Sequence, residues 1–379
     1  MLSQRKWSES VKKAIVRSLD LPHGRRTLIV SDIHGNLPLL KGALVKAGLC
    51  EDDILIVLGD MVERSETSLE TLQYVMELSK NYTVYTICGN CDNLVLDFVQ
   101  GGKELPTAFF QRWFSRHGER CVLVKMAHLA GVPVEDPVDY PAAQKAIAQR
   151  FPAEIAFLES LPHILINDDY LLVHGGVPGE DGLEELDAFD CMKNDDFLMK
   201  SHLFSHVFRR WVVVGHTPVT LLREDIPSAA PIVDEKRHVV GIDGGCTLKL
   251  DGQLNVLILP QEPGGDFSWV SYDGFPEQTA LDAQEPSPDP INIRWGHSKL
   301  EVLERGELLS RCRHGESGRV LDVLTEYLWE KDGETYCEDS TDYRLPVAPG
   351  DTLSVVRRLP DRALCKKDGV TGWYFGRLE

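Results

Sequence analysis

Six side chains with oxygen or imidazole donor atoms each follow a short run rich in valine, isoleucine and leucine. Five runs end in this way, and most of these endings hold a glycine that lets the backbone turn sharply. In an open α/β sheet, ligands bind beyond the carboxyl ends of the strands, so these groups are expected to meet in one crevice. The candidate metal ligands are Asp32, His34, Asp60, Asn90, His174 and His216.

Six groups of this kind suit two divalent metal ions that share one carboxylate. Oxygen and imidazole ligands without thiolate favour Mn²⁺, Fe or Zn²⁺ over softer metals, and Mn²⁺ is the ion expected here. Two ions about 3.5–4 Å apart can acidify a bridging water and hold both the attacking and the leaving oxygen of a phosphoryl transfer. Arg64, four residues after Asp60, is placed to clamp a phosphate oxygen. The predicted chemistry is therefore hydrolysis of a phosphate ester.

Each of these motifs has a plainer interpretation when it is taken alone. A lone buried histidine is more often a core residue, and a lone aspartate after a strand is more often a helix cap. Cys88 and Cys91 also have the spacing of a redox pair, but the two residues between them belong to the metal motif. Cys91 is instead expected at the metal site, as a thiol that reacts or touches metal. The complete set of motifs, in order, outweighs these interpretations.

The elements that must position these groups alternate between strands and helices over residues 26–260. Short apolar runs rich in β-branched residues are typical of a sheet that helices cover on both sides. Helical spacing follows at residues 39–47, and Thr67 with Glu70 predicts a capping box at the next helix. The fold class is α/β, with a mostly helical insertion at about 101–165. The predicted strands are residues 27–30, 54–58, 83–88, 170–173, 211–214 and 239–242.

The remaining segments differ in composition. Residues 1–25 are rich in lysine and arginine, and we expect a basic helix that packs on the first domain, with a membrane-surface helix as the alternative. Residues 246–258 predict a closing hairpin with its turn at Asp251 and Gly252. Residues 261–298, which hold several prolines and glycines, are expected to be a linker. Asp-Gly turns then predict a small all-β domain over 299–379, whose segments 350–356 and 369–376 resemble a bacterial SH3-like barrel.

The composition limits the possible partners. The 379 residues include 40 Lys and Arg against 59 Asp and Glu, and a formal charge of −19 disfavours nucleic acid. No run approaches the roughly 18 apolar residues of a membrane span, so no membrane partner is expected. The nine cysteines, an odd number without a secretion signal, predict reduced thiols and a cytoplasmic location. The oligomeric state is left open.

The ordered motifs resemble those of the calcineurin-like metallophosphoesterases, in the branch of phosphoprotein phosphatases and diadenosine-tetraphosphate hydrolases. The resemblance covers about residues 26–258 and implies a four-layer α/β/β/α sandwich with a dinuclear metal centre. By motif position, it implies that one ion is held by Asp32, His34 and Asp60. The second ion would then be held by Asp60, as the bridging ligand, together with Asn90, His174 and His216.

The sequence also departs from the phosphoprotein phosphatase pattern. That family carries Gly-Asn-His-Glu at the third motif, where the histidine protonates the leaving group, whereas this chain has cysteine at position 91 and aspartate at 92. Glu63 stands where the family has the aspartate partner of that histidine, and Lys193 stands near the place of a second phosphate-binding arginine. General-acid catalysis contributes about 10²–10⁴-fold. Its loss hurts little when the leaving group is an aryl oxide or a phosphate.

The hypothesis is a metal-dependent phosphoesterase that hydrolyses phosphomonoesters or phosphodiesters by attack of a metal-bound hydroxide. Its substrate would be a phosphorylated small molecule or a phosphoprotein. One alternative is a Ser/Thr phosphoprotein phosphatase in which Asp92, His117 or His128 replaces the general acid. The other is a non-catalytic metal-binding scaffold that keeps the fold.

Overall fold

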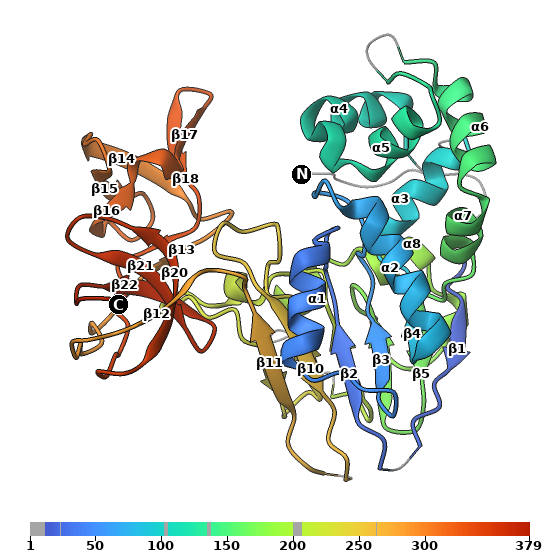
Figure 1. Cartoon of the computed structure of the whole chain (residues 1–379), viewed down its shortest axis with the longest axis horizontal. Coiled ribbons are helices and arrows are strands. Elements are labelled where there is room, and N and C mark those ends of the chain that lie inside the picture. Colours follow the sequence, from blue (N-terminus) through green and yellow to red (C-terminus); the bar gives the residue numbers. More distant parts are fainter. Residues whose placement is uncertain (1–11, 23, 102–104, 135–137, 200–206, 263) are drawn as a thin grey trace.

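The computed structural model describes residues 12–22, 24–101, 105–134, 138–199, 207–262 and 264–379. They form an α/β body and an all-β region beside it, which holds the C-terminus (Figure 1). Every helix in these ranges is too short or too polar to traverse a lipid bilayer. The predicted α/β class with an all-β C-terminal region is confirmed.

The first sheet of the body contains three of the predicted strands. Its order is β11-β10-β2-β3-β4, in which β2, β3 and β4 run parallel while β10 and β11 are antiparallel to their neighbours. The bounds are β2 Thr27–Val30, β3 Ile54–Val57, β4 Thr83–Thr86, β10 Leu254–Ile258 and β11 Ser268–Tyr272. The run at 27–30 matches its strand, and the next two strands end slightly earlier than predicted.

The second sheet contains the other three predicted strands. Its order is β1-β5-β6-β7-β9-β8, and the central strands β6, β7 and β9 run parallel. The bounds are β1 Val16–Ser18, β5 Ile164–Ile166, β6 Tyr170–Val173, β7 Trp211–Val214, β8 Ile232–Asp234 and β9 Val239–Gly241. Predicted ligands follow the carboxyl ends of β2, β3 and β4 in the first sheet and of β6 and β7 in the second.

The two sheets pack face to face. Because successive side chains of a strand point to opposite faces, each sheet presents one face to the other sheet and one face to helices. Ile29 and Ile56 of the first sheet join Leu172 and Val213 of the second in one buried cluster between the sheets. Residues of the opposite faces pack against helices instead. Helices α1, α2 and α3 contribute to the core of the first sheet, and α8 and α9 to the core of the second. This is the predicted four-layer α/β/β/α sandwich.

The insertion is mostly helical, as predicted, and its buried residues join the core of the first sheet. Its helices α4 and α5 lie beyond the upper end of α3 in Figure 1.

The helix bounds are α1 Leu37–Lys46, α2 Ser68–Asn81, α3 Asn90–Val99, α4 Thr107–His117, α5 Val122–Leu129, α6 Tyr140–Arg150, α7 Pro152–Glu159, α8 Ala188–Met192 and α9 Asp196–Met199. Short 3₁₀ turns lie at Gly118–Arg120, Leu183–Glu185, Val219–Leu222 and Thr325–Tyr327.

The basic helix predicted at 1–25 is wrong where the structure describes this segment. Val16–Ser18 forms β1, which pairs in parallel with β5. Next to it, the backbone N–H of Ile15 donates to Nδ1 of His163 at 2.9 Å. The edge of β5 offers unpaired backbone groups, and pairing with them outweighs the weak helical stripe. Residues 1–11 lie outside the described residues.

The predicted closing hairpin and linker are also wrong. β9 belongs to the second sheet and β10 to the first, so the chain crosses between sheets at residues 242–253. The segment 261–298 contains β11 and two further short strands, β12 Glu277–Thr279 and β13 Asn292–Ile293. Each of these strands covers the edge of a neighbouring strand, which leaves fewer exposed backbone groups than a free linker would.

The C-terminal region consists of antiparallel strands around two small cores. It begins with β12, earlier than the predicted residue 299, and its sheets have the orders β12-β20-β21-β22, β13-β19 and β16-β15-β14-β18-β17. The turns at Asp332 and Asp368 form hairpins as predicted. The bounds are β14 Lys299–Glu304, β15 Leu309–His314, β16 Val320–Leu324, β17 Leu328–Lys331, β18 Glu334–Cys337, β19 Ser340–Thr341, β20 Thr352–Arg358, β21 Ala363–Lys367 and β22 Val370–Tyr374. The SH3-like assignment stays a prediction.

Candidate metal centre and active-site pocket

The predicted ligands lie at the carboxyl ends of strands from both sheets. The first sheet supplies Asp32 and His34 after β2, Asp60 after β3 and Asn90 at the start of α3, and the second supplies His174 after β6 and His216 after β7. The potential ligand atoms form two groups, and the atoms of each group all lie within 4.8 Å of one another. One group is His34, Asp60 and Cys91, and the other is Asp60, His174 and His216. The two sheets therefore build one centre, and Asp60 belongs to both groups.

Asp60 lies between the histidines of the centre. Nε2 of His34 is 3.9 Å from Oδ2 of Asp60, and Nε2 of His174 is 3.4 Å from Oδ1 of the same carboxylate. Both imidazoles are also 3.9 Å from Oδ1 of Asp32. The ring centroids of His174 and His216 are 5.3 Å apart. Because each oxygen of Asp60 faces a different histidine, this carboxylate has the placement that a bridging ligand needs.

Buried ligand atoms without hydrogen bonds fit a bound cation. Oδ1 of Asp32 and Oδ1 of Asn90 are both buried and lack a hydrogen-bond partner. Leaving such an atom unsatisfied costs about 1–3 kcal/mol, which coordination of a cation would offset. Hydrogen bonds hold other ligand side chains in place. Oδ2 of Asp32 accepts the backbone N–H of His216 at 2.9 Å, and the carbonyl of Leu58 lies 2.8 Å from Nδ1 of His174. The residues present therefore fit a divalent metal centre.

An unusual backbone conformation recurs around the centre. Six residues other than glycine have positive φ values between 47° and 76°, in the left-handed region that costs about 1–3 kcal/mol. Such residues persist only when the surrounding structure enforces them, and they cluster at active sites. They are Asp32, His34, Asp60, Glu63, Arg64 and His216. Four of the six are predicted metal ligands.

Two glycines let neighbouring loops approach the ligands closely. A Cβ atom on Gly89 would lie 2.2 Å from the backbone nitrogen of Asp60 and 2.3 Å from its Oδ1. A Cβ atom on Gly215 would lie 2.3 Å from Oδ2 of Asp32. Neither distance leaves room for a carbon atom. The glycines next to the ligands are therefore required by packing, as the sequence indicated.

The buried carboxylates create a field that favours positive charge. Burial alone would lower the pKa of His174, but Asp60 and Asp32 outweigh it and raise this pKa to about 10. Asp243 is a further buried carboxylate, to which we gave no role from the sequence. Burial, and then Asp32, raise the pKa of Asp243 well above its ordinary value, and its Oδ2 has no hydrogen-bond partner. This density of carboxylates is suited to a divalent cation.

Cys91 lines the pocket beside the ligands, as predicted. Its backbone N–H donates to Oδ1 of Asp60 at 2.8 Å. Burial, and then the charge of Asp60, raise the pKa of the thiol well above its ordinary value, so the thiol is neutral near pH 7. Asp92, one of the predicted replacement acids, is not among the residues that line the pocket. Its two oxygens accept the backbone N–H groups of Met61 and Gly89 at 3.0 and 2.9 Å.

Arg64 also lines the pocket and is supported by the insertion. Its guanidinium carbon lies 5.4 Å from the ring centre of Trp113, within the range of a cation–π contact. Glu63 fixes that tryptophan, because Oε2 accepts its indole N–H at 2.7 Å while Oε1 accepts the backbone N–H of Val122 at 3.0 Å. Glu63 thus positions the insertion, which the sequence did not indicate.

The pocket has a volume of about 910 Å³ and extends from the metal centre to the C-terminal region. Arg116, His117 and Lys193 add further positive or polar groups to its lining. Among the predicted replacement acids, His117 lies in the pocket, whereas His128 is within 2.5 Å of Glu119 and is not a lining residue. Burial and the charge of Arg64 lower the pKa of His117 to about 4.

Asp195 is a neighbour of the centre that sequence reasoning missed. Its Oδ1 lies 2.8 Å from Nε2 of His216. No strand end or glycine motif marks this aspartate, since it lies in the short segment between α8 and α9. Trp295, Tyr327, Trp329 and Trp373 of the C-terminal region also line the pocket. The sequence did not indicate that these aromatic residues lie in the same pocket as the metal ligands, because nothing local in the sequence brings the two regions together.

Comparisons with known proteins identify the family of this chain. Residues 25–242 match the calcineurin-like phosphoesterase family. Two asymmetrical bis(5'-nucleosyl)-tetraphosphatases PrpE, from Bacillus velezensis and Oceanobacillus iheyensis, are 25% and 24% identical over 240 and 243 residues, and each match covers 58% of this chain and 83% of the relative. A solved metallophosphoesterase from Sphaerobacter thermophilus has a TM-score of 0.35 and 18% identity over 62% of this chain and 83% of its own. The chain belongs to the calcineurin-like phosphoesterase family and is a metallophosphoesterase.

Proposed function

We propose that this enzyme hydrolyses phosphate esters and anhydrides that have good leaving groups, using two divalent metal ions. The observation that carries the proposal is the convergence of predicted ligands from both sheets around Asp60, with Arg64 lining the same pocket. One ion would be held by Asp32, His34 and Asp60. The other would be held by Asp60, Asn90, His174 and His216.

The chain's own groups would position the phosphate and the ligands. When bound, the ions supply an acidified water and neutralise charge on the phosphate. Arg64, held against Trp113, binds a non-bridging phosphate oxygen. The carbonyl of Leu58 orients the imidazole of His174 so that Nε2 faces Asp60. Mn²⁺ is the ion to test first, and the odd number of cysteines, nine, fits a reducing cytoplasm.

The proton donors in the pocket favour a leaving group that needs no protonation. Cys91 is neutral but has a raised pKa, and His117, with a pKa of about 4, carries no proton to donate near pH 7. An alkoxide such as that of phosphoserine leaves poorly without an acid. A nucleoside phosphate leaves easily, and the names of two relatives specify a dinucleoside tetraphosphate. We therefore propose dinucleoside polyphosphates as the substrate class.

The test compares three substrates in the presence of Mn²⁺: diadenosine tetraphosphate, bis(p-nitrophenyl) phosphate and a phosphoserine peptide. We expect turnover of the first two, loss of that turnover with a chelator, and its recovery when Mn²⁺ is restored. Asp60→Asn, which weakens the shared ligand, should abolish it. Preference for the peptide would favour the phosphoprotein phosphatase. Tight Mn²⁺ binding without turnover of any of the three would favour the scaffold and overturn the proposal.

A further inference from the structure

The active-site pocket continues from the metal ligands onto the C-terminal region. Aromatic side chains of that region, Trp295, Tyr327, Trp329 and Trp373, line its far part. The family match ends at residue 242, so these residues lie beyond it. These four side chains form the far wall of the pocket. The far wall can contact only those parts of a substrate that extend away from the reacting phosphate.

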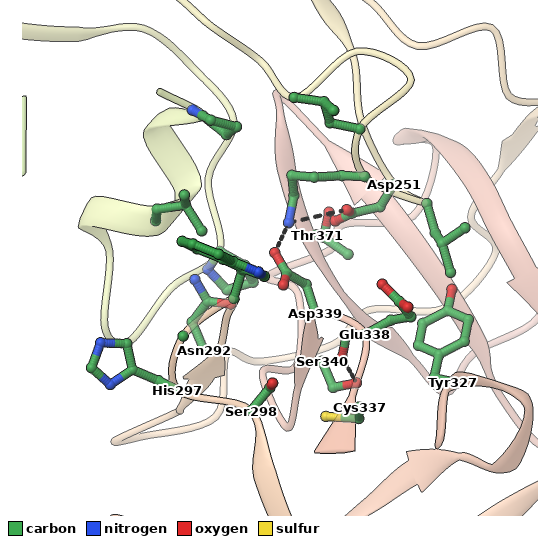
Figure 2. Close-up of a pocket in the computed structure, with 18 of the residues that line it drawn as sticks. Asp251, Asn292, His297, Ser298, Tyr327, Cys337, Glu338, Asp339, Ser340 and Thr371 are labelled. Carbon is green, nitrogen blue, oxygen red and sulfur yellow. Dashed lines mark hydrogen bonds and ion pairs between the residues drawn. The ribbon is translucent and has the colours of Figure 1, made fainter. Parts of the chain in front are cut away.

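A partly buried ionic cluster holds the C-terminal region against the body at this pocket. Figure 2 shows Asp251, Asp339 and Thr371 gathered at the junction. The ammonium group of Lys249 pairs with Asp339 and lies 3.6 Å from Asp251, and the hydroxyl of Thr371 donates to Asp251 at 2.6 Å. Lys366 donates to the carbonyl of Asp251 at 2.6 Å. Because partners come from both sides, the far wall has a fixed position.

A second set of bonds fixes the turn that carries Trp295. Nε of Arg294 donates to the carbonyl of Leu221 at 2.8 Å, and the amide of Asn292 donates to the carbonyl of Arg223 at 2.8 Å. Leu221 itself lines the pocket, five residues after the metal ligand His216. The turn is therefore tied to the segment that leaves the metal centre.

Trp295 presents an open aromatic face at this place. Its side chain is 77% exposed although it lines the pocket. Lys249 pairs with both Asp339 and Asp251, and Glu338 is a further carboxylate that lines the pocket. A flat, uncharged aromatic group needs an open ring face, which Trp295 provides. This part of the wall is therefore suited to a nucleobase.

We propose that Trp295 stacks on the base of the substrate's nucleoside, so that the C-terminal region selects nucleotide substrates. This inference rests on the proposed function. Stacking of a base on an aromatic side chain is tolerant of base identity, because every base has a π face. The region then serves as a recognition wall for the same active site, and the metal centre and Arg64 hold the phosphates.

The test is Trp295→Ala, assayed with diadenosine tetraphosphate and with bis(p-nitrophenyl) phosphate, whose rings are attached directly to the phosphate. We expect KM for diadenosine tetraphosphate to rise between about 5-fold and about 160-fold, the range of base–aromatic stacking, with kcat little changed. The kinetic constants for the aryl diester should stay within twofold, and Trp295→Tyr should restore most of the affinity. The matched control is Trp269→Ala, because Trp269 is 41% exposed and is not among the pocket residues.

The outcomes separate this inference from the proposed function. If wild-type protein hydrolyses neither substrate, the proposed function fails. If wild-type protein is active and Trp295→Ala leaves KM for the dinucleotide unchanged, the nucleobase contact is refuted while the phosphoesterase stands. Equal losses on both substrates, or the same loss in Trp269→Ala, would also refute it, because the effect would then be a general one. A wild-type preference for a basic phosphopeptide would assign the wall to a peptide instead.

Discussion

Replacing Gly89 with alanine tests how closely the backbone determines the metal centre. Gly89 has a φ of −94°, which alanine adopts without strain, so any effect comes from the added methyl group. That carbon would lie 2.2 Å from the nitrogen of Asp60, whereas ordinary contacts begin at 3.4 Å. The two groups must therefore separate by 1.2 Å, the difference between these two distances. The shared carboxylate of Asp60 would be displaced with its backbone.

A misplacement of about 1 Å at a reacting centre can cost about 100-fold in rate. We therefore expect Gly89→Ala to lower kcat/KM for bis(p-nitrophenyl) phosphate at least about 100-fold and to weaken Mn²⁺ binding measured by calorimetry. Overpacking should lower the free energy of unfolding by about 1–3 kcal/mol, and circular dichroism would show whether the protein remains folded. Gly179→Ala is the control, because a methyl group there meets nothing within 4 Å. Wild-type Mn²⁺ affinity and rate in folded Gly89→Ala would refute the reasoning.

Three other changes have expected outcomes. Arg64→Lys keeps the charge but loses the planar fork, so kcat/KM for diadenosine tetraphosphate should fall about 10-fold or more at an unchanged melting temperature; an unchanged kcat/KM would exclude a phosphate contact. Lys249→Met leaves the partly buried Asp339 without its cation, and urea denaturation should show a loss of about 1–3 kcal/mol in the free energy of unfolding, whereas no loss would mean that the junction does not depend on this pair. Burial lowers the pKa of His163 in the folded protein from 6.5 to about 4. The free energy of unfolding therefore keeps its full value above pH 6.5 and decreases by about 3 kcal/mol as the pH falls from 6.5 through 4, because the unfolded chain takes up the proton first. Urea titrations of wild type and His163→Asn between pH 7 and pH 4 measure this term, and identical pH dependence in both would contradict it.

The metal centre could be predicted because its information is local. Each ligand lies within a few residues of a strand that is apolar along its whole length, and parallel strands bring their carboxyl ends to one edge. Four of the predicted ligands have left-handed backbone, which follows from the sharp turns at those strand ends. Within the first sheet this topology accounts for the convergence of Asp32 and Asp60. His174 comes from the second sheet, so its convergence with them also requires the face-to-face packing of the two sheets.

Features that depend on distant partners could not be predicted. The capping box at Thr67 does not form, because its hydroxyl donates to the carbonyl of Gly35 at 2.6 Å and Glu70 pairs with Lys125 instead. Glu63 binds the insertion rather than the residue at position 91. The Asp-Gly pair at 251–252 is typical of a hairpin, yet the strands on either side of it belong to different sheets. In each case a tertiary contact outweighs a correct local signal.

The division of the ligands between two sheets has a mechanical consequence. Asp60 belongs to one sheet and His216 to the other. Between them the sheets are joined by side-chain packing, such as that of Ile29 with Val213, and by hydrogen bonds, such as the one from the backbone N–H of His216 to Asp32. An ion held from both sides acts as a cross-link across that interior. A ligand that binds only the folded state at 100 times its Kd stabilises it by about 2.7 kcal/mol. Amide protons of the inner strands β2 and β7 should therefore exchange with deuterated solvent more slowly in the metal-loaded protein than after chelation.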